Sequence, residues 1–139
     1  MPTPTEIAPI LQDHFNNRRG DELLKLWTDD FSFRGLGREF VGKEKMLQQE
    51  QNLWTAFPDI QCKIEPFLNG EDKVVFKSTF TGTHTGPLLL GGSQTVAATG
   101  NKITFTVFVF LTMRDGLVAA EELCYDTADF RRQLNMKAG

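Results

Sequence analysis

Residues 102–126 read KITFTVFVFLTMRDGLVAAEELCYD, and this stretch decides the fold. In its first half, apolar side chains occupy every second position from Ile103 to Met113, a pattern typical of a long strand with one covered face. Arg114, Asp115 and Gly116 then supply turn chemistry, and a second strand-like run follows at once. The stretch therefore predicts a long antiparallel hairpin whose apolar face must be covered by another layer.

Segments with apolar residues at helical spacing stand ahead of the hairpin and predict that layer. Three helices are expected there: one opened by Thr5 as its N-cap, one capped by Asp21 that holds Trp27, and one over residues 43–56. Strands are expected over residues 31–34, 60–65 and 73–83, and a short helix capped by Asp126 is expected over residues 128–134. Asp59 is expected to hold the turn between the third helix and the next strand.

Helices gathered ahead of an antiparallel sheet are typical of the α+β class. The economical packing places the three N-terminal helices against a strongly curved antiparallel, or mixed, sheet, with the short helix at the C-terminal end. Such a sheet forms a cone with a pocket inside it. With 139 residues, the chain is expected to form one domain that spans residues 1–139.

Composition and charge argue against several classes of protein. The 15 Lys and Arg against 18 Asp and Glu give a net charge of −3, so a basic face for nucleic acid is not expected. No apolar run reaches the length of a membrane span, and no membrane partner is expected. The opening residues, MPTPTEIAP, lack the pattern of a signal peptide, and a cytoplasmic location is expected.

Two cysteines, Cys62 and Cys124, stand in apolar, strand-like segments. Neither has the paired spacing of a zinc site, so both are expected to be small core residues. A zinc site is therefore not expected.

The order of several motifs resembles the SnoaL-like polyketide cyclases, a family of the nuclear-transport-factor-two-like superfamily. The most specific motifs are FTGTHTG at residues 80–86 and FPD at residues 57–59, while ATGNKITF at residues 98–105 and CYDTADFRRQL at residues 124–134 extend the match. The resemblance implies a pocket between helices and sheet, small aromatic or ester substrates, no metal and frequent dimers. It also implies ring closure by an intramolecular aldol step, with an acidic residue of the last strand as acid or base.

The sequence departs from the family pattern where family members usually carry polar groups. The inner face of the long strand is expected to hold Val107 and Val109, and Leu123 stands at a position that is often polar. These departures favour a second hypothesis, in which the same fold is a binding module for a hydrophobic ligand and performs no chemistry.

Two adjacent carboxylates on the last strand mark the candidate site. Because successive strand residues face opposite ways, one of Glu121 and Glu122 points to the covered side, and the family pattern puts Glu121 there. Burial would raise the pKa of that carboxyl, which suits a base that takes a proton beside a carbonyl. The alternative is that Glu121 lies at a wet rim or pairs with a cation.

Two further polar residues stand on apolar helix faces. His14 follows Leu11 at helical spacing and either lines the pocket or is a hydrogen-bonded core residue. Glu50 either tilts to solvent or meets His14, Glu121 or a ligand in the cavity. The candidate catalytic residues are thus Glu121 as the base, with His14 and Glu50 as orienting or second proton-transfer groups.

The candidate substrate-binding residues are mainly apolar, because flat apolar walls suit a flat ligand. They are Trp54, Phe33, Phe80, Phe105, Val107, Val109, Leu123 and His84. For His84 the alternative is a structural role, since Thr-His-Thr between two glycines is typical of a turn at a strand end.

The favoured hypothesis is a cofactor-independent acid–base enzyme, of cyclase, isomerase or hydrolase type, that acts on a hydrophobic, carbonyl-bearing small molecule. A third hypothesis is an interaction protein whose outer sheet face is the working surface. Phe108 and Phe110 point to that face and would be exposed in a monomer, so a homodimer through it is expected.

Overall fold

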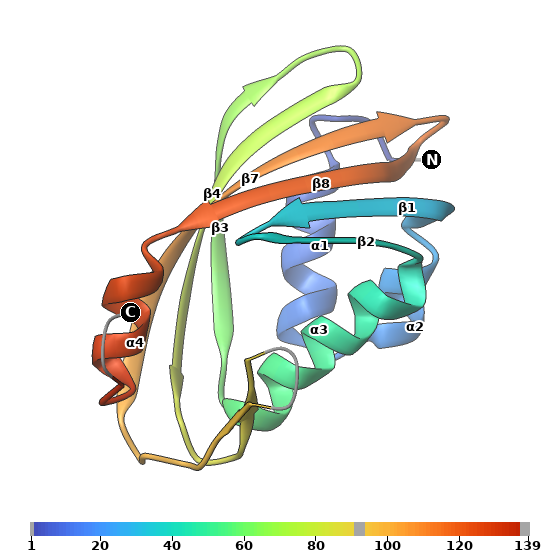
Figure 1. The fold of residues 1–139 in the computed structure, drawn as a ribbon. Helices are drawn as coiled ribbons and strands as arrows, with labels where there is room; N and C mark the ends of the chain where they lie inside the picture. Colours follow the sequence, from blue (N-terminus) through green and yellow to red (C-terminus); the bar gives the residue numbers. More distant parts are fainter. Residues whose placement is uncertain (1, 91–93, 137–139) are drawn as a thin grey trace.

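The computed structural model describes residues 2–90 and 94–136. Its elements follow in the order α1 (Ile7–Asn16), α2 (Gly20–Leu24), β1 (Trp27–Gly35), β2 (Arg38–Val41), α3 (Lys43–Ala56), β3 (Gln61–Asn69), β4 (Lys73–Thr83), β5 (Leu88–Leu89), β6 (Thr95–Val96), β7 (Lys102–Arg114), β8 (Leu117–Tyr125) and α4 (Thr127–Gln133). Figure 1 shows α1, α2 and α3 on one side of a strongly curved sheet, with α4 beside the end of β8. The predicted α+β class with helices against a curved sheet is confirmed.

The main sheet has six strands in the order β2-β1-β8-β7-β4-β3. All neighbours are antiparallel except β1 and β8, which are parallel, so the sheet is mixed. The central hairpin is confirmed, because β7 and β8 pair across a two-residue loop formed by Asp115 and Gly116. Both loop residues have positive φ, at 53° and 78°, as the tightest hairpin turns require.

A β-bulge in β8 changes which of its residues face inward. Met113 pairs with Val118 and Thr112 with Ala120, so one extra residue, Ala119, stands in β8 between them. As a result Val118 and Glu121 are both buried, although they are three residues apart. Strict alternation from Glu121 would place Val118 on the opposite face of β8, and the bulge brings it to the same face.

The N-terminal helix boundaries differ from the predictions at three points. The residue at the N-cap position of α1 is Glu6 rather than Thr5, and its side chain makes no capping hydrogen bond; its carboxylate accepts from the Thr3 hydroxyl at 2.8 Å instead. α2 is preceded by Arg19, and Asp21 lies in its first turn rather than at its cap. Trp27 opens β1 instead of closing α2, because it pairs with Val118 of β8.

Other local predictions are confirmed. Asp126 caps α4 by accepting from the Asp129 amide at 2.9 Å. Asp59 holds the turn after α3, since its two carboxylate oxygens accept from the Thr83 amide at 2.7 Å and the Thr83 hydroxyl at 2.8 Å. The short strands β2, β5 and β6 were not expected, because two to four residues carry little periodicity.

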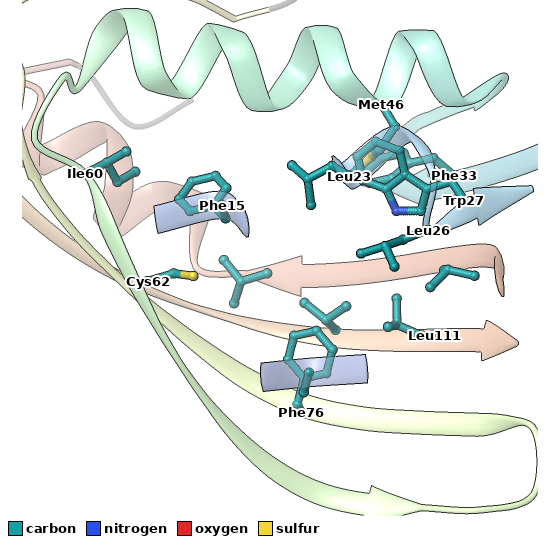
Figure 2. Close-up of a cluster of buried hydrophobic side chains, with 14 of the residues drawn as sticks. Phe15, Leu23, Leu26, Trp27, Phe33, Met46, Ile60, Cys62, Phe76 and Leu111 are labelled. Atoms are coloured by element: carbon teal, nitrogen blue, oxygen red, sulfur yellow. The ribbon is translucent and has the colours of Figure 1, made fainter. Parts of the chain in front are cut away.

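The core fills the space between the helices and the inner face of the sheet. Figure 2 shows Phe15 and, from β1, Trp27 on one side of the cluster, with Phe76 and Leu111 on the strands across from them. Cys62 belongs to this buried cluster, as expected. Cys124 does not, because it lies on the outer face of β8, opposite Phe108, and is exposed. No helix within the described residues is long and apolar enough to cross a membrane.

Candidate functional site

A cavity of about 900 Å³ lies between the helices and the inner face of the sheet. Its volume is in the range of roughly 300–1,000 Å³ that small-molecule sites occupy. The helices contribute Leu11 and Phe15 of α1 and Met46, Glu50 and Leu53 of α3. The strand residues that line it are Trp27, Phe33, Arg38, Phe40, Cys62, Ile64, Phe76, Ser78, Phe80, Leu88, Leu89, Phe105, Val107, Val109, Glu121, Leu123 and Tyr125. Most of the wall is therefore apolar, with a few polar groups set into it.

The structure places most of the expected wall residues at the cavity. Phe33, Phe80, Phe105, Val107, Val109 and Leu123 all line it. Trp54 does not line the cavity. Its ring packs against that of Phe15, with 5.6 Å between the ring centroids, and Phe15 is the one of the two that lines the wall.

His84 also lies away from the cavity lining. It is fully buried, and its Nδ1 accepts from the Thr99 amide at 3.2 Å, so it fastens the segment ahead of β7 to the end of β4. Burial lowers the pKa of His84, which favours the neutral imidazole. Of the two roles considered for His84, the geometry supports the structural one.

Glu121 points into the cavity from the middle of the sheet. It lies in β8 between Phe33 of β1 and Leu111 of β7, and its side chain is 9% exposed. Within residues 2–90 and 94–136, no hydrogen bond or ion pair engages its carboxylate. Burial, with a smaller effect from the charge of Glu50, raises the pKa of Glu121 to about 8. The carboxyl is therefore neither at a wet rim nor paired with a cation.

Glu50 faces the same cavity from α3. It is half-buried, and burial raises its pKa to about 7. In the part of the chain that the structure describes, no cation or hydrogen-bond donor pairs with its carboxylate. Of the alternatives that the sequence left open, the structure supports the one in which Glu50 meets Glu121 across the cavity.

The two carboxyls form a coupled pair, which we call the Glu50/Glu121 pair. The negative charge of Glu50 acts on Glu121, so the second proton leaves less readily than the first. With pKa values of about 7 and about 8, the singly protonated pair is the main form over the intervening pH range. A site with one ionised and one protonated carboxyl can accept a proton and donate another in the same step.

His14 is not part of this arrangement. It is absent from the cavity lining, and its Nδ1 lies 3.1 Å from a guanidinium nitrogen of Arg19. Leu11 and Phe15 take the inward positions of α1, and His14 is rotated by about 100° from Phe15 along the helix. The expectation that His14 lines the pocket is therefore corrected. Among the described residues, no group of three or more His, Cys, Asp and Glu is placed to hold a metal ion.

Ser78 is a cavity residue that sequence reasoning missed. It is 2% exposed, and its hydroxyl has no hydrogen-bond partner among the described residues. The weakly hydrogen-bonding thiol of Cys62 acts on it too loosely to count as a partner. Burial, and then the charge of Glu50, raises the pKa of that thiol to about 12, while Ser78 acts to lower it. A signal was present, because the inward row Val74, Phe76, Ser78 and Phe80 of β4 is apolar except for this serine.

The opening of the cavity carries basic residues. Arg38 of β2, Lys45 of α3 and Arg131 of α4 all line it, and Arg38 and Lys45 are exposed, so these two lie where the cavity meets solvent. Tyr125 lines the cavity at the end of β8, with its ring 5.6 Å from that of Phe105. Burial raises the pKa of Tyr125, while Arg38 and Arg131 act on it in the opposite direction.

Comparisons with known proteins agree with this fold. The family model described as SnoaL-like polyketide cyclase matches residues 5–134. None of the curated proteins matches the sequence.

Solved structures extend the likeness at low sequence identity. A proposed SnoaL-like polyketide cyclase from Jannaschia sp. CCS1 has a TM-score of 0.82 at 20% identity, over 94% of this chain and 90% of that one. AclR, a proposed hydroxylase from Streptomyces galilaeus, has a TM-score of 0.76 at 23% identity, over 92% and 79%. A hypothetical protein with a ketosteroid isomerase-like fold from Catenulispora acidiphila DSM 44928, in complex with trimethylamine, has a TM-score of 0.73 at 15% identity, over 99% and 97%. At these identities the likeness shows the fold alone.

Proposed function

The chain belongs to the SnoaL-like polyketide cyclase family, and we propose that it is an acid–base enzyme for a hydrophobic, carbonyl-bearing small molecule. The observation that carries this proposal is the Glu50/Glu121 pair. Within the described residues, neither carboxyl has a cation or a hydrogen-bond partner, so ionising either one in an apolar cavity costs free energy. No contact in that part of the chain gives either side chain a structural role. Perturbed acids that face one cavity are typical of proton-transfer sites.

The proposed step is enolisation. In the singly ionised pair, one carboxylate takes the proton from the carbon beside the carbonyl, while the protonated partner donates its proton to the carbonyl oxygen. The sequence favoured Glu121 as the base. Because the pKa values of Glu50 and Glu121 differ little, either carboxylate can act as the base while the other is the acid. The Ser78 hydroxyl supports the step as a further donor toward the developing oxyanion.

This chemistry moves protons only, so the proposal includes no cofactor. The enol or enolate formed in the cavity is the nucleophile that an aldol ring closure needs, and the same enolisation would serve an isomerase. A cytoplasmic location, expected from the sequence, stays a prediction.

A simple ketone tests the proposal without knowledge of the natural substrate. 2-Tetralone deuterated beside its carbonyl is flat and apolar, and the wild-type protein is expected to accelerate loss of its deuterium to water, followed by NMR. The rate is expected to peak between the pKa values of about 7 and about 8, because the pair lacks a base below this range and lacks an acid above it. A rate that matches buffer at every pH contradicts the proposal.

The binding module remains the second candidate, and the aliphatic row of Val107, Val109 and Leu111 on β7 favours it. The same experiment separates the two. A binding module would take up 2-tetralone, as seen by line broadening of the ligand, and would leave its deuterium in place.

We also propose that the outer sheet face pairs with a second copy of the chain. Phe108 is 39% exposed and Phe110 is 46% exposed, and Phe67 stacks on Phe108 at 6.0 Å between centroids. Beside these rings, Lys77 and Glu65 form an ion pair at 3.0 Å on the same face. A flat apolar patch bordered by both signs of charge is complementary to its own copy, and this supports an isologous dimer.

Phe108→Glu is expected to split this dimer, because it places a charge at the centre of the buried patch. Sedimentation at micromolar concentration should show the wild-type protein as a dimer and the variant as a monomer. Val41→Glu is the matched control, since Val41 is exposed on the edge strand β2, away from the patch. Sedimentation of the wild-type protein as a monomer would contradict the proposed dimer.

A further inference from the structure

The charges that line the cavity are sorted by depth. Glu121 is buried among the apolar walls and Glu50 is half-buried, whereas Arg38 and Lys45 are exposed where the cavity meets solvent and Arg131 is half-buried. The cavity is therefore acidic inside and basic at its entrance, and a ligand that fills it meets both regions.

Arg38 and Arg131 line the same cavity from separate elements. Arg38 stands at the start of β2 and Arg131 in the last turn of α4. Both act electrostatically on the same phenol, that of Tyr125, which itself lines the cavity. Arg38, Tyr125 and Arg131 all line this one cavity, so a ligand in it can reach both guanidinium groups.

Neither guanidinium is neutralised by an acid among the described residues. Arg38 donates to the amide oxygen of Gln49, a neutral group that holds it toward α3 and the cavity. The nearest acids in sequence are engaged elsewhere: Glu39 pairs with Arg34 at 3.0 Å, Asp129 pairs with Arg132 at 3.1 Å, and Asp126 caps α4. Two cations at one opening thus keep their hydrogen-bonding capacity for a ligand.

We infer that the substrate is an amphiphile, with a hydrophobic carbonyl-bearing body in the cavity and an anionic group bound between Arg38 and Arg131 at the opening. This inference rests on the proposed function of the cavity and names the class of its substrate. Arginine suits the role, because its planar fork binds carboxylate or phosphate oxygens in pairs. The charges also fix the orientation, since an anion is attracted to the entrance and repelled from the ionised carboxylate inside.

Two fluorescent probes of nearly the same shape test the inference by binding alone. 8-Anilino-1-naphthalenesulfonate carries a negative charge, and N-phenyl-1-naphthylamine is its neutral counterpart. The double variant Arg38→Met with Arg131→Met is expected to bind the sulfonate about tenfold more weakly, which corresponds to about 1.4 kcal/mol, and to bind the amine as the wild type does. Added salt is expected to weaken binding of the sulfonate probe and to leave binding of the amine probe unchanged.

Matched controls locate the effect. Lys63→Met with Lys102→Met removes the same charge from exposed strand positions that do not line the cavity, and it should leave both probes unchanged. Leu53→Trp narrows the cavity and should weaken both probes together. If the double arginine variant loses its fold, as judged by circular dichroism, each single variant is measured instead and should weaken the sulfonate selectively.

Three outcomes would overturn the inference: equal weakening of both probes, no weakening of the sulfonate, or sulfonate binding that survives Leu53→Trp. Competition with 1-naphthoate and with 1-naphthyl phosphate then separates the two sources of negative charge, since the better competitor identifies a carboxylate or a phosphate. Because the readout is binding, it is independent of deuterium loss from 2-tetralone, and failure of the proposed enolisation is recognised separately.

Discussion

Replacing Glu121 by glutamine is expected to slow deuterium loss from 2-tetralone by about 10²–10⁴-fold, the range that a positioned acid–base group contributes. Glutamine keeps the shape of the side chain but can neither take a proton from carbon nor share one with Glu50. The effect should appear in the turnover rate rather than in binding, because the apolar walls that hold the ketone are unchanged. NMR of the ketone at a pH between about 7 and about 8, where the singly protonated pair is the main form in the wild type, is the measurement.

Glu122→Gln is the matched control, since Glu122 is the next residue of β8 and is exposed on the outer face. It removes the same charge one position away and should leave the exchange rate near that of the wild type. Glu50→Gln should lower the rate as well, and it should turn the peaked pH profile into a single rise, because only one titrating carboxyl remains. Equal rates for the wild type and Glu121→Gln would remove Glu121 from the chemistry.

The hairpin and the inward position of Glu121 could be predicted because both depend on local patterns. Alternation from Ile103 to Met113 fixes the faces of β7, and Asp115-Gly116 fixes the turn. Family pattern then supplied the register of β8 at Glu121. Strict alternation would misplace Val118, because a bulge adds a residue to the strand and no residue type marks it in the sequence.

Other features depend on tertiary contacts that the sequence does not express locally. Trp27 has an apolar environment in either a helix or a strand, and only the parallel pairing of β1 with β8 makes it a strand residue. His14 and Trp54 were assigned to the pocket from helical spacing, but Leu11 and Phe15 occupy the inward positions of that layer. Arg38 and Arg131 are 93 positions apart in the chain (131 − 38), and only the tertiary fold brings them to the lining of one cavity.

The second large effect concerns stability and its dependence on pH. A carboxyl whose pKa is raised by folding destabilises the native state when it ionises, because the unfolded chain ionises more readily. The pKa of Glu121 rises from its ordinary value of 4.5 to about 8, so stability should fall as pH rises through this interval and stay low above it. Below pH 4.5 the side chain is protonated in both states and contributes no such penalty.

Glu121→Gln should therefore be more stable than the wild type at pH 9, and close to it at pH 4.5. Each pKa unit corresponds to about 1.4 kcal/mol, so the gain in unfolding free energy at pH 9 is expected to be on the order of 2–4 kcal/mol. Urea unfolding at both pH values measures the difference, with Glu122→Gln as the exposed control that should show no such trend. A variant that gains stability at high pH while it loses deuterium exchange identifies Glu121 as a group kept for chemistry at the expense of stability. A variant that is less stable than the wild type at pH 9 would instead mean that the ionised carboxylate is stabilised in the fold, and that Glu121 is a structural residue.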